Sequence, residues 1–369
     1  MGILRLLLAL SVLAAHSTPI LGVRLISGGA AVHLFFVISG FYMALILTGK
    51  YHDHQTFYVN RFLRLWPTYL VVLIAGYAWY YFCWSYTGQK PPPFWLAQAY
   101  EVLPWWQALM LRVANFSMLG LDIPFNLFYQ PSVGLFFIPF NTTAPDGAYW
   151  AYRFVEIGPA WSISMEIWFY LLAPLLVRRR LAILMALIVA SAALNLSGDF
   201  IGLPTYFFFP AQLYLFITGI VVYRFYEGHR SMIDAHRAGP AILGIVVAAF
   251  LCYRWIPAAW GPFVISAVCV PALPWLFACF RDSRWDSAIG NLSYPIYVCH
   301  VLVGTMLATA FDIDNGTVLA GVSVAVSTVL HLVIEKPINR YRQALAGSNS
   351  KFARQHLEPV TPAAMPVSR

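Results

Sequence analysis

Charged residues are scarce in this chain. Only 10% of its 369 residues are Asp, Glu, Lys or Arg, whereas an ordinary soluble domain carries roughly 25%. Hydrophobic residues make up 60% of the sequence, and the mean hydropathy is +0.69. So few charges cannot cover a surface that faces water. This scarcity excludes an ordinary soluble protein and predicts an integral membrane protein whose solvent is the lipid bilayer.

Patterns for metal, disulfide or nucleic-acid chemistry are also lacking. The five cysteines lie within or beside apolar segments, without a CxxC motif or a pairing pattern, and are expected to be small buried hydrophobes. The histidines lack the spacing of metal ligands, so we predict no metal site. The net charge of +8 comes from short basic clusters between apolar runs, which indicate membrane orientation and not a nucleic-acid partner.

Long apolar runs dominate the sequence. A membrane-spanning helix needs about 20 mostly apolar residues, and the first run lacks a convincing signal-peptide cleavage site, so we expect it to be retained. The predicted spans are residues 3–22, 30–48, 65–85, 161–177, 181–198, 206–223, 239–256, 261–280, 289–310 and 316–334. A shorter stretch, 106–120, is interrupted by Arg112 and Asn115.

The basic clusters predict the orientation of these spans. All of them fall on one face of the membrane if 106–120 does not cross it, and that face is expected to be cytoplasmic. The prediction is an all-α, polytopic transmembrane helix bundle of about ten spans with both termini in the cytoplasm. Residues 1–342 would form the membrane domain, with a Pro- and aromatic-rich external region at 86–160 that contains a re-entrant or interfacial segment at 106–120. The polar tail 343–369 is expected to be disordered.

Ionisable residues inside the apolar runs are candidates for function, because charge at membrane depth is costly. His16 lies toward the outer end of the first span, where a neutral imidazole can act as a general base. Glu166 has a similar predicted depth and can orient an imidazole. His300 lies near mid-depth as a candidate pocket residue, and His33 is more typical of a structural residue. For each, the alternative is a hydrogen bond between packed helices.

Arg61 and Arg64 form an RxxR pair and share one helix face. Pro67 suits the first turn of a new helix, and Trp66 before it is disfavoured from helical conformation. The two guanidinium groups are therefore predicted just ahead of a helix N-terminus, an arrangement that suits phosphate oxygens. The alternative is that both arginines only mark the cytoplasmic side.

These residues together resemble a known family. The chain is similar to the membrane-bound acyltransferase family three, which includes bacterial O-acyltransferases of surface polysaccharides and macrolides. The resemblance covers nearly the whole chain, from about Arg5 to Arg342. It rests on six blocks in order: VLAAHS, LFFVISGF, RxxR with an aromatic-Pro pair, WSISMEIWFYLLAPLL, LSYPIYVCH and IEKP.

The resemblance implies roles for single residues. His16 matches the family's essential histidine, Arg61 and Arg64 match the pair thought to engage the acyl donor, and Glu166 and His300 match the acidic residue and the histidine of later blocks. Many members carry an acidic residue where this chain has His33, which places the role of His33 in doubt. From the same blocks we add Trp161, Ser164 and Tyr294 as pocket candidates.

The expected function is transfer of an acyl group, with acetyl as the first choice, from a coenzyme A thioester at the cytoplasmic face to a hydroxyl of a carbohydrate. The expected acceptor is a surface polysaccharide, a lipid-linked glycan or a glycosylated metabolite, and the expected location is the bacterial cytoplasmic (inner) membrane. Acyl-CoA is a substrate in this scheme, and no permanently bound cofactor is predicted. One alternative is a transporter or flippase, although the chain lacks the matching halves of many transporters. Another is a non-catalytic membrane partner that presents substrate. The sequence carries no signal for the oligomeric state.

Overall fold

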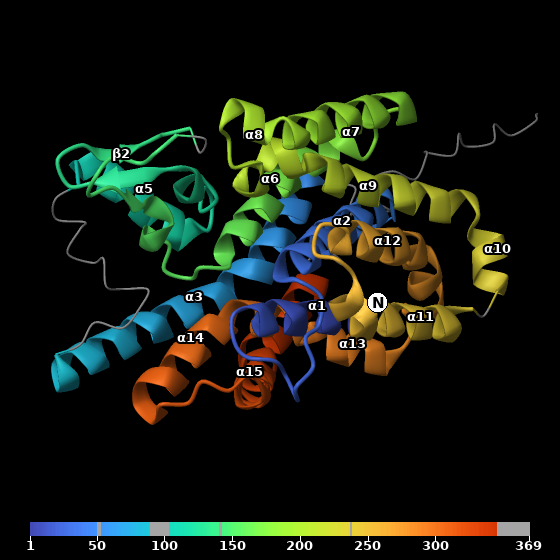
Figure 1. The fold of residues 1–369 in the computed structure, drawn as a ribbon. Coiled ribbons are helices and arrows are strands. Elements are labelled where there is room, and N and C mark those ends of the chain that lie inside the picture. Colours follow the sequence, from blue (N-terminus) through green and yellow to red (C-terminus); the bar gives the residue numbers. More distant parts are fainter. Residues whose placement is uncertain (50–52, 89–102, 140–141, 237, 345–369) are drawn as a thin grey trace, which may run out of the picture.

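The computed structural model describes residues 1–49, 53–88, 103–139, 142–236 and 238–344. Within these ranges the chain is a bundle of helices, and each of the ten predicted spans overlaps a helix, although the helix of the first span ends at Ala15 and not at residue 22 (Figure 1). These helices are α1 (Gly2–Ala15), α2 (Gly28–Gly49), α3 (His54–Thr87), α6 (Ala160–Leu176), α7 (Leu181–Leu196), α9 (Phe209–Gly228), α11 (Gly239–Cys252), α12 (Gly261–Phe280), α14 (Ser293–Phe311) and α15 (Gly316–Leu330). The all-α prediction is confirmed for these ranges, whereas the predicted tail lies almost wholly outside them.

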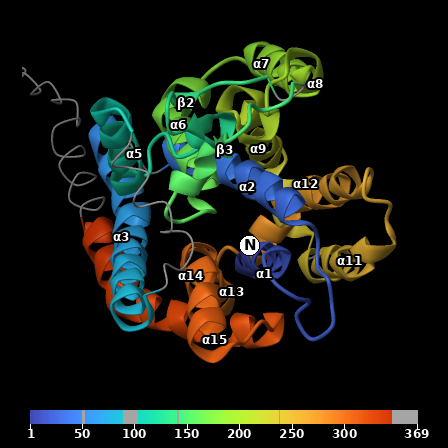
Figure 2. The same cartoon turned by 60° about the vertical axis from the view of Figure 1, so that its left-hand side comes forward.

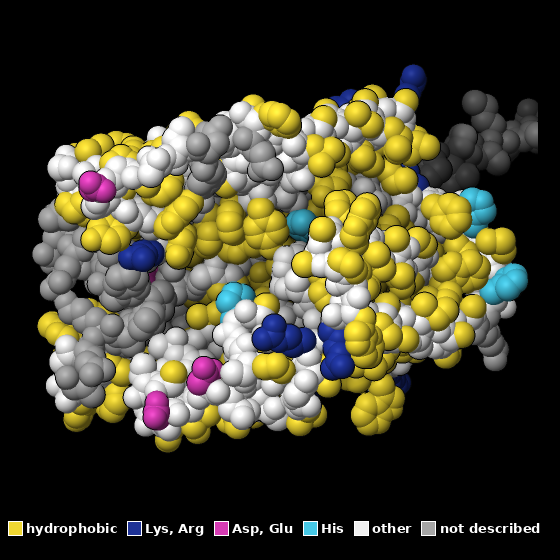
Figure 3. Space-filling view, viewed as in Figure 1, with side chains coloured by type: hydrophobic (Ala, Val, Ile, Leu, Met, Phe, Trp, Pro, Cys, Tyr) yellow, Lys and Arg dark blue, Asp and Glu magenta, His cyan; other side chains and the backbone are white. Residues whose placement is uncertain are grey.

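Five helical stretches in the described part of the chain are long and apolar enough to cross a bilayer. They are Gly28–Gly49, His54–Tyr86, Gly261–Phe280, Arg284–Phe311 and Gly316–Ala344. Several shorter helices, among them α1, α6, α7 and α11, are also apolar. Hydrophobic side chains cover much of the face seen in Figure 3, as expected for contact with lipid. The protein is thus an integral membrane protein, while the count of about ten spans and the cytoplasmic placement of both ends stay predictions.

The third helix differs from the prediction. α3 begins at His54, where the carboxylate of Asp53 accepts hydrogen bonds from the backbone N–H groups of Gln55 and Thr56. It continues without a break through Pro67, so the RxxR pair lies within a helix and not ahead of a helix N-terminus. The prediction of a new helix at Pro67 is wrong. Proline removes one backbone hydrogen bond, but packed neighbours in a membrane protein make such a helix tolerable.

Helices α2 and α9 pack so closely that their backbones touch. A Cβ atom placed on Gly40 would lie 1.9 Å from the carbonyl oxygen of Phe216, and one placed on Gly219 would lie 2.0 Å from that of Val37. Small residues that permit such close approach are a common feature of helix contacts in membranes. The SGF part of the LFFVISGF block therefore has a packing role at Gly40, next to Ser39 on the same helix.

The beginning of α1 is fixed to a short helix far along the chain. The buried carboxylate of Asp286, in α13 (Arg284–Asn291), accepts hydrogen bonds from the backbone N–H groups of Gly2, at 2.5 Å, and Ile3, at 2.9 Å. The amino group of Met1 lies 2.6 Å from the same carboxylate. Asp286 thus satisfies the first N–H groups of α1, which have no partner inside the helix. Figure 2 shows the resulting position of α1 beside α13 and α14.

The region predicted to be external forms a lobe at one end of the bundle (Figure 1). The stretch 106–120 is largely helix α5 (Trp105–Ser117), which contacts α3 through hydrogen bonds from Trp66 Nε1 and Tyr69 Oη to backbone carbonyls of α5. A small antiparallel sheet follows, with strand order β2-β1-β3, and it was not predicted. Its strands are β1 (Phe128–Gln130), β2 (Gly134–Phe136) and β3 (Tyr149–Trp150). Residues 89–102 of this predicted region lie outside the described residues.

Several short elements complete the described part of the chain. They are η2 (Ile123–Asn126), η3 (Ala151–Phe154), α8 (Gly198–Ile201), η4 (Thr205–Phe207), α10 (Arg230–Ala235), η5 (Tyr253–Trp255) and a π-helical turn at His331–Glu335 that continues α15.

Candidate active site

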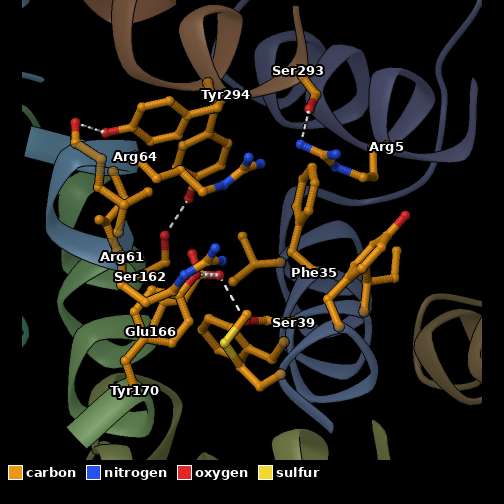
Figure 4. A pocket seen from close by; sticks show the side chains of 18 of the residues that line it. Arg5, Phe35, Ser39, Arg61, Arg64, Ser162, Glu166, Tyr170, Ser293 and Tyr294 are labelled. Carbon is orange, nitrogen blue, oxygen red and sulfur yellow. Dashed lines mark hydrogen bonds between the residues drawn. The ribbon is translucent and has the colours of Figure 1, made fainter. Parts of the chain in front are cut away.

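A cavity of about 270 Å³ lies between five helices, α1, α2, α3, α6 and α14. Figure 4 shows its polar residues around one space: Arg5 from α1, Arg61 and Arg64 from α3, Glu166 from α6 and Tyr294 from α14. Four of these five, all except Arg5, were singled out from the sequence. The structure thus brings the RxxR pair, the acidic residue and the tyrosine of three separate blocks to one place.

The cavity is rich in positive charge. Three guanidinium groups and one carboxylate are among its lining side chains, so its charge is 3 − 1 = +2 when Glu166 is ionised. Arg61 Nε is buried and has no hydrogen-bond partner among the described residues, and its guanidinium carbon lies 5.9 Å from the ring centroid of Tyr170. Within the same ranges, the Arg64 side chain makes no hydrogen bond or ion pair. Unpaired guanidinium groups in a cavity suit an anion with several oxygens.

Arg5 is the third cation, and the sequence analysis did not assign it a role. Its Nη2 donates a hydrogen bond to Ser293 Oγ at 3.0 Å, and Ser293 Oγ donates in turn to the carbonyl oxygen of Gly290. An arginine near the start of an apolar run is typical of a signal for membrane orientation, so the sequence offers no separate reason to expect Arg5 in a binding site. The usable signal was its position at the inner end of the first span, on the side of the membrane predicted for Arg61 and Arg64.

Glu166 has partners other than those expected. Its Oε1 accepts hydrogen bonds from Ser39 Oγ at 2.6 Å and from Tyr170 Oη at 2.5 Å. The expectation that Glu166 orients His16 is wrong for this structure. The reason lies in the packing, because α6 contacts α2, α3 and α9, whereas α1 contacts α2, α13, α14 and α15. Glu166 is therefore hydrogen-bonded to Ser39 and Tyr170 in the wall of the cavity.

His16 instead lies beside His300. His16 caps the C-terminal end of α1, where its side chain is exposed, and His300 is fully buried in α14. His300 Nε2 is 3.3 Å from His16 Nδ1, and the ring centroids are 5.1 Å apart. Two histidines that were predicted separately, 284 residues apart, thus form one pair. They lie outside the lining of the cationic cavity.

Comparison with known proteins decides the family. The family model described as an acyltransferase domain matches residues 1–334. The chain belongs to acyltransferase family three. The resemblance of the six sequence blocks is thereby confirmed, and acyl transfer is the activity of this domain. No curated protein and no solved structure matches the chain.

The remaining candidate residues of this acyltransferase have different surroundings. Tyr294 lines the cavity, and its hydroxyl donates to the carbonyl oxygen of Leu65 at 2.7 Å. Trp161 is buried in an aromatic cluster with Tyr206 and Phe207. His33 lies against Tyr206, with its Nε2 buried and without a hydrogen-bond partner in the described part of the chain. Neither Trp161 nor His33 lines the cavity.

Ser164 also lies outside the cavity, in a buried polar cluster. Its Oγ donates to Asp122 Oδ1 at 2.6 Å and accepts hydrogen bonds from the backbone N–H groups of Gly120 and Leu121. Trp168 Nε1 donates to the same carboxylate oxygen. Burial raises the pKa of Asp122, while the hydrogen bonds from Ser164 and Trp168 act in the opposite direction. Ser164 therefore fixes the segment after α5 onto α6, which explains the second serine of the WSISME block.

No group of metal-binding side chains is present among the described residues. The polar side chains of the cavity are arginines, tyrosines, serines and one glutamate, which suit recognition of an anion and hydrogen bonding to a polar substrate, and the other lining side chains are apolar.

Proposed function

We propose that this membrane protein transfers an acyl group, preferentially acetyl, from a coenzyme A thioester to a hydroxyl group of a carbohydrate. The donor enters from the cytoplasmic face, and its phosphates bind Arg5, Arg61 and Arg64. His16 is the general base. The observation that carries this proposal is one cavity with three arginines, whose walls include the two helices, α1 and α14, that lead to the paired histidines.

The charge of the cavity supports an acyl donor with phosphate groups. Arg61 and Arg64 have no acidic partner among the described residues, so their charges are available to a ligand. Guanidinium groups bind phosphate oxygens through two parallel hydrogen bonds, which gives both affinity and orientation. A transporter for a neutral sugar has no evident need for three such groups at one site.

The two helices also connect the cavity to the histidine pair. Arg5 and His16 are eleven residues apart on α1, which corresponds to about 16 Å along a helix. On α14, Tyr297 lines the cavity and His300 follows one turn later. A donor whose phosphates lie at the arginines would extend its long pantetheine arm along these two helices. The thioester at the end of that arm would then lie near His16.

The proposed reaction needs a base and no other reagent. His16 removes the proton from the acceptor hydroxyl, and the oxygen attacks the carbonyl carbon of the thioester. The new C–O ester bond forms, the C–S bond breaks, and the proton held by His16 passes to the leaving thiolate. A positioned histidine contributes about 10²- to 10⁴-fold to such a step.

A carbohydrate acceptor is supported by the aromatic side chains of the external lobe. Trp105 and Trp106 are exposed at the start of α5, and Tyr149 is exposed in β3. Their flat rings can stack on the apolar face of a sugar, and we propose that the bacterial cytoplasmic membrane holds the enzyme with this lobe outward. A surface polysaccharide, a lipid-linked glycan or a glycosylated metabolite fits this chemistry.

The test uses membranes that contain the protein, radiolabelled acetyl-CoA and an extract of cell-envelope glycans. We expect label in the glycan fraction, and we expect His16→Ala to reduce its rate at least 100-fold. The matched control is His229→Ala, because His229 also caps the C-terminal end of a helix, α9, is also exposed and contacts a backbone carbonyl four residues earlier, but lies far along the chain. Near-normal transfer by His16→Ala would refute the role of the base. Glycan that crosses the membrane without acquiring label would favour the transporter alternative.

A further inference from the structure

We infer that His300 is a positioning residue that holds His16 in the tautomer whose free nitrogen, Nε2, acts as the base. This inference rests on the proposed function and deepens it. It concerns the pair of histidines and not the donor cavity. The contacts of three nitrogen atoms, both of His300 and Nδ1 of His16, decide it, because each contact fixes where a proton can lie.

The contacts of His300 allow one arrangement of its proton. Its Nδ1 lies 2.9 Å from the carbonyl oxygen of Tyr297 and 3.1 Å from that of Ile296. Carbonyl oxygens only accept hydrogen bonds, so Nδ1 must carry a proton to make these contacts favourable. A neutral imidazole carries one N–H group. Nε2 of His300 is therefore an acceptor, and it is this atom that faces His16.

The contacts of His16 follow from those of His300. His16 Nδ1 lies 2.9 Å from the carbonyl oxygen of Val12 and 3.3 Å from His300 Nε2. Both neighbours are acceptors, so His16 Nδ1 carries the proton and shares it between them. The opposite tautomer would place a lone pair at Nδ1 against two other lone pairs. His16 Nε2 is thus left unprotonated and free to take a proton from an acceptor hydroxyl.

The environment of His300 makes it suitable for this task. His300 is 0% exposed, and α14 packs directly against α1, so its ring is held in place by protein on all sides. His16 by contrast is exposed at the helix end, where a side chain has more freedom. The buried ring therefore orients the exposed one. After His16 has taken the proton, its Nδ1–H still points at the lone pair of His300, which stabilises the charged ring without neutralising it.

The test compares two substitutions of His300. In His300→Phe an aromatic ring remains but the nitrogen acceptor is lost, and we expect kcat to fall roughly 10- to 100-fold, by analogy with groups that orient metal-bound histidines. The KM for acetyl-CoA should not change, because His300 lies outside the donor cavity. His300→Gln places an amide oxygen near the position of Nε2, and we expect it to recover at least one third of the wild-type kcat. The packing control is Cys299→Ala, at a buried neighbour in the same helix.

The outcomes separate this inference from the proposed function. If His16→Ala is inactive while His300→Phe keeps the wild-type kcat, the positioning role is refuted and the base remains. If His300→Phe and His300→Gln lower kcat equally and both proteins are well folded, the role of His300 as a hydrogen-bond acceptor is refuted. Full activity of His16→Ala would overturn the proposed base itself. Abundance in the membrane and the unfolding temperature in detergent identify any variant that fails to fold.

Discussion

Replacement of Arg64 by glutamine tests the donor site with little disturbance to the fold. The Arg64 side chain lines the cavity and makes no hydrogen bond or ion pair within the described ranges. Its removal therefore leaves no protein group without a partner, which is the usual cause of a large loss of stability. The neighbouring charge of Arg5 repels Arg64, so Arg64→Gln removes one like-charge repulsion from the free protein.

The expected magnitude follows from one charged contact. A hydrogen bond to a charged group contributes about 1.5–3 kcal/mol, and each 1.4 kcal/mol corresponds to about tenfold in affinity. Arg64→Gln should thus raise the KM for acetyl-CoA roughly 10- to 150-fold. The phosphates of the donor lie far from the reacting carbonyl, so their contact is equal in the ground state and the transition state. Loss of such uniform binding raises KM and leaves kcat unchanged.

The assay measures the initial rate of acetyl transfer in membranes over a range of acetyl-CoA concentrations. The control is Arg180→Gln, which also removes one arginine, but an exposed one in the loop after α6 and outside the cavity. It should leave both constants unchanged. An unchanged KM in Arg64→Gln would favour the alternative that the RxxR pair only marks the cytoplasmic side of the membrane. A loss of kcat alone would place Arg64 at the reacting atoms, which the proposed arrangement forbids.

Three further predictions concern stability. Burial raises the pKa of Glu156 from 4.5 to about 7, so folding takes up a proton between pH 4.5 and 7 and the stability of the protein falls as the pH rises through this range. Glu156→Gln should abolish this pH dependence and raise the free energy of unfolding at pH 8 by about 3 kcal/mol, as measured by unfolding in detergent. Gly219→Ala forces α2 and α9 apart and should cost about 1–3 kcal/mol, whereas the control Gly244→Ala, with nothing within 4 Å of its added Cβ, should be neutral or stabilising. Ser164→Ala should lower the unfolding temperature but leave the KM for acetyl-CoA unchanged, since its hydroxyl serves a buried cluster outside the cavity; a changed KM would contradict that reading.

The positions of the helices were predictable from hydropathy because a bilayer leaves few choices. Every backbone polar group within it must be paired internally, so each long apolar run becomes a helix. The same reasoning explains the error at Pro67. The rule that proline starts or ends a helix comes from proteins in water, where the freed backbone groups have an easy alternative partner. Among packed helices, a break in the helix would give the freed backbone groups no such partner, so α3 continues through Pro67.

The small sheet could not be predicted for a different reason. Its strands are two or three residues long, too short for the alternation of polar and apolar residues to be recognised. They also lie in a region rich in proline and aromatics, where Phe128 stacks on Trp150 across the strands. Ring contacts of this kind depend on the tertiary structure, and no pattern in the local sequence predicts them.

The candidate site divides in the same way. Glu166 was predictable from its membrane depth, Arg61 and Arg64 from a pattern that suits phosphate, and Tyr294 only from the family resemblance. All four do share one cavity. The partner of His16 was not predictable. Depth along each helix can be counted from the sequence, but which helices are neighbours cannot, and α1 and α14 belong to opposite ends of the chain.

The arrangement of the lining residues separates two parts of the bundle. Every described residue that lines the cationic cavity comes from α1, α2, α3, α6 or α14, and none of them comes from α7, α9, α11, α12 or α15. Helix α2 joins the two parts, since one side carries Ser39 toward the cavity and the adjacent Gly40 packs against α9. A substitution at Gly40 therefore acts on both parts at once, because any added atom that moves α2 away from α9 moves Ser39 relative to Glu166. We expect Gly40→Ala to change kcat as well as stability, whereas Gly244→Ala, in α11, should change neither.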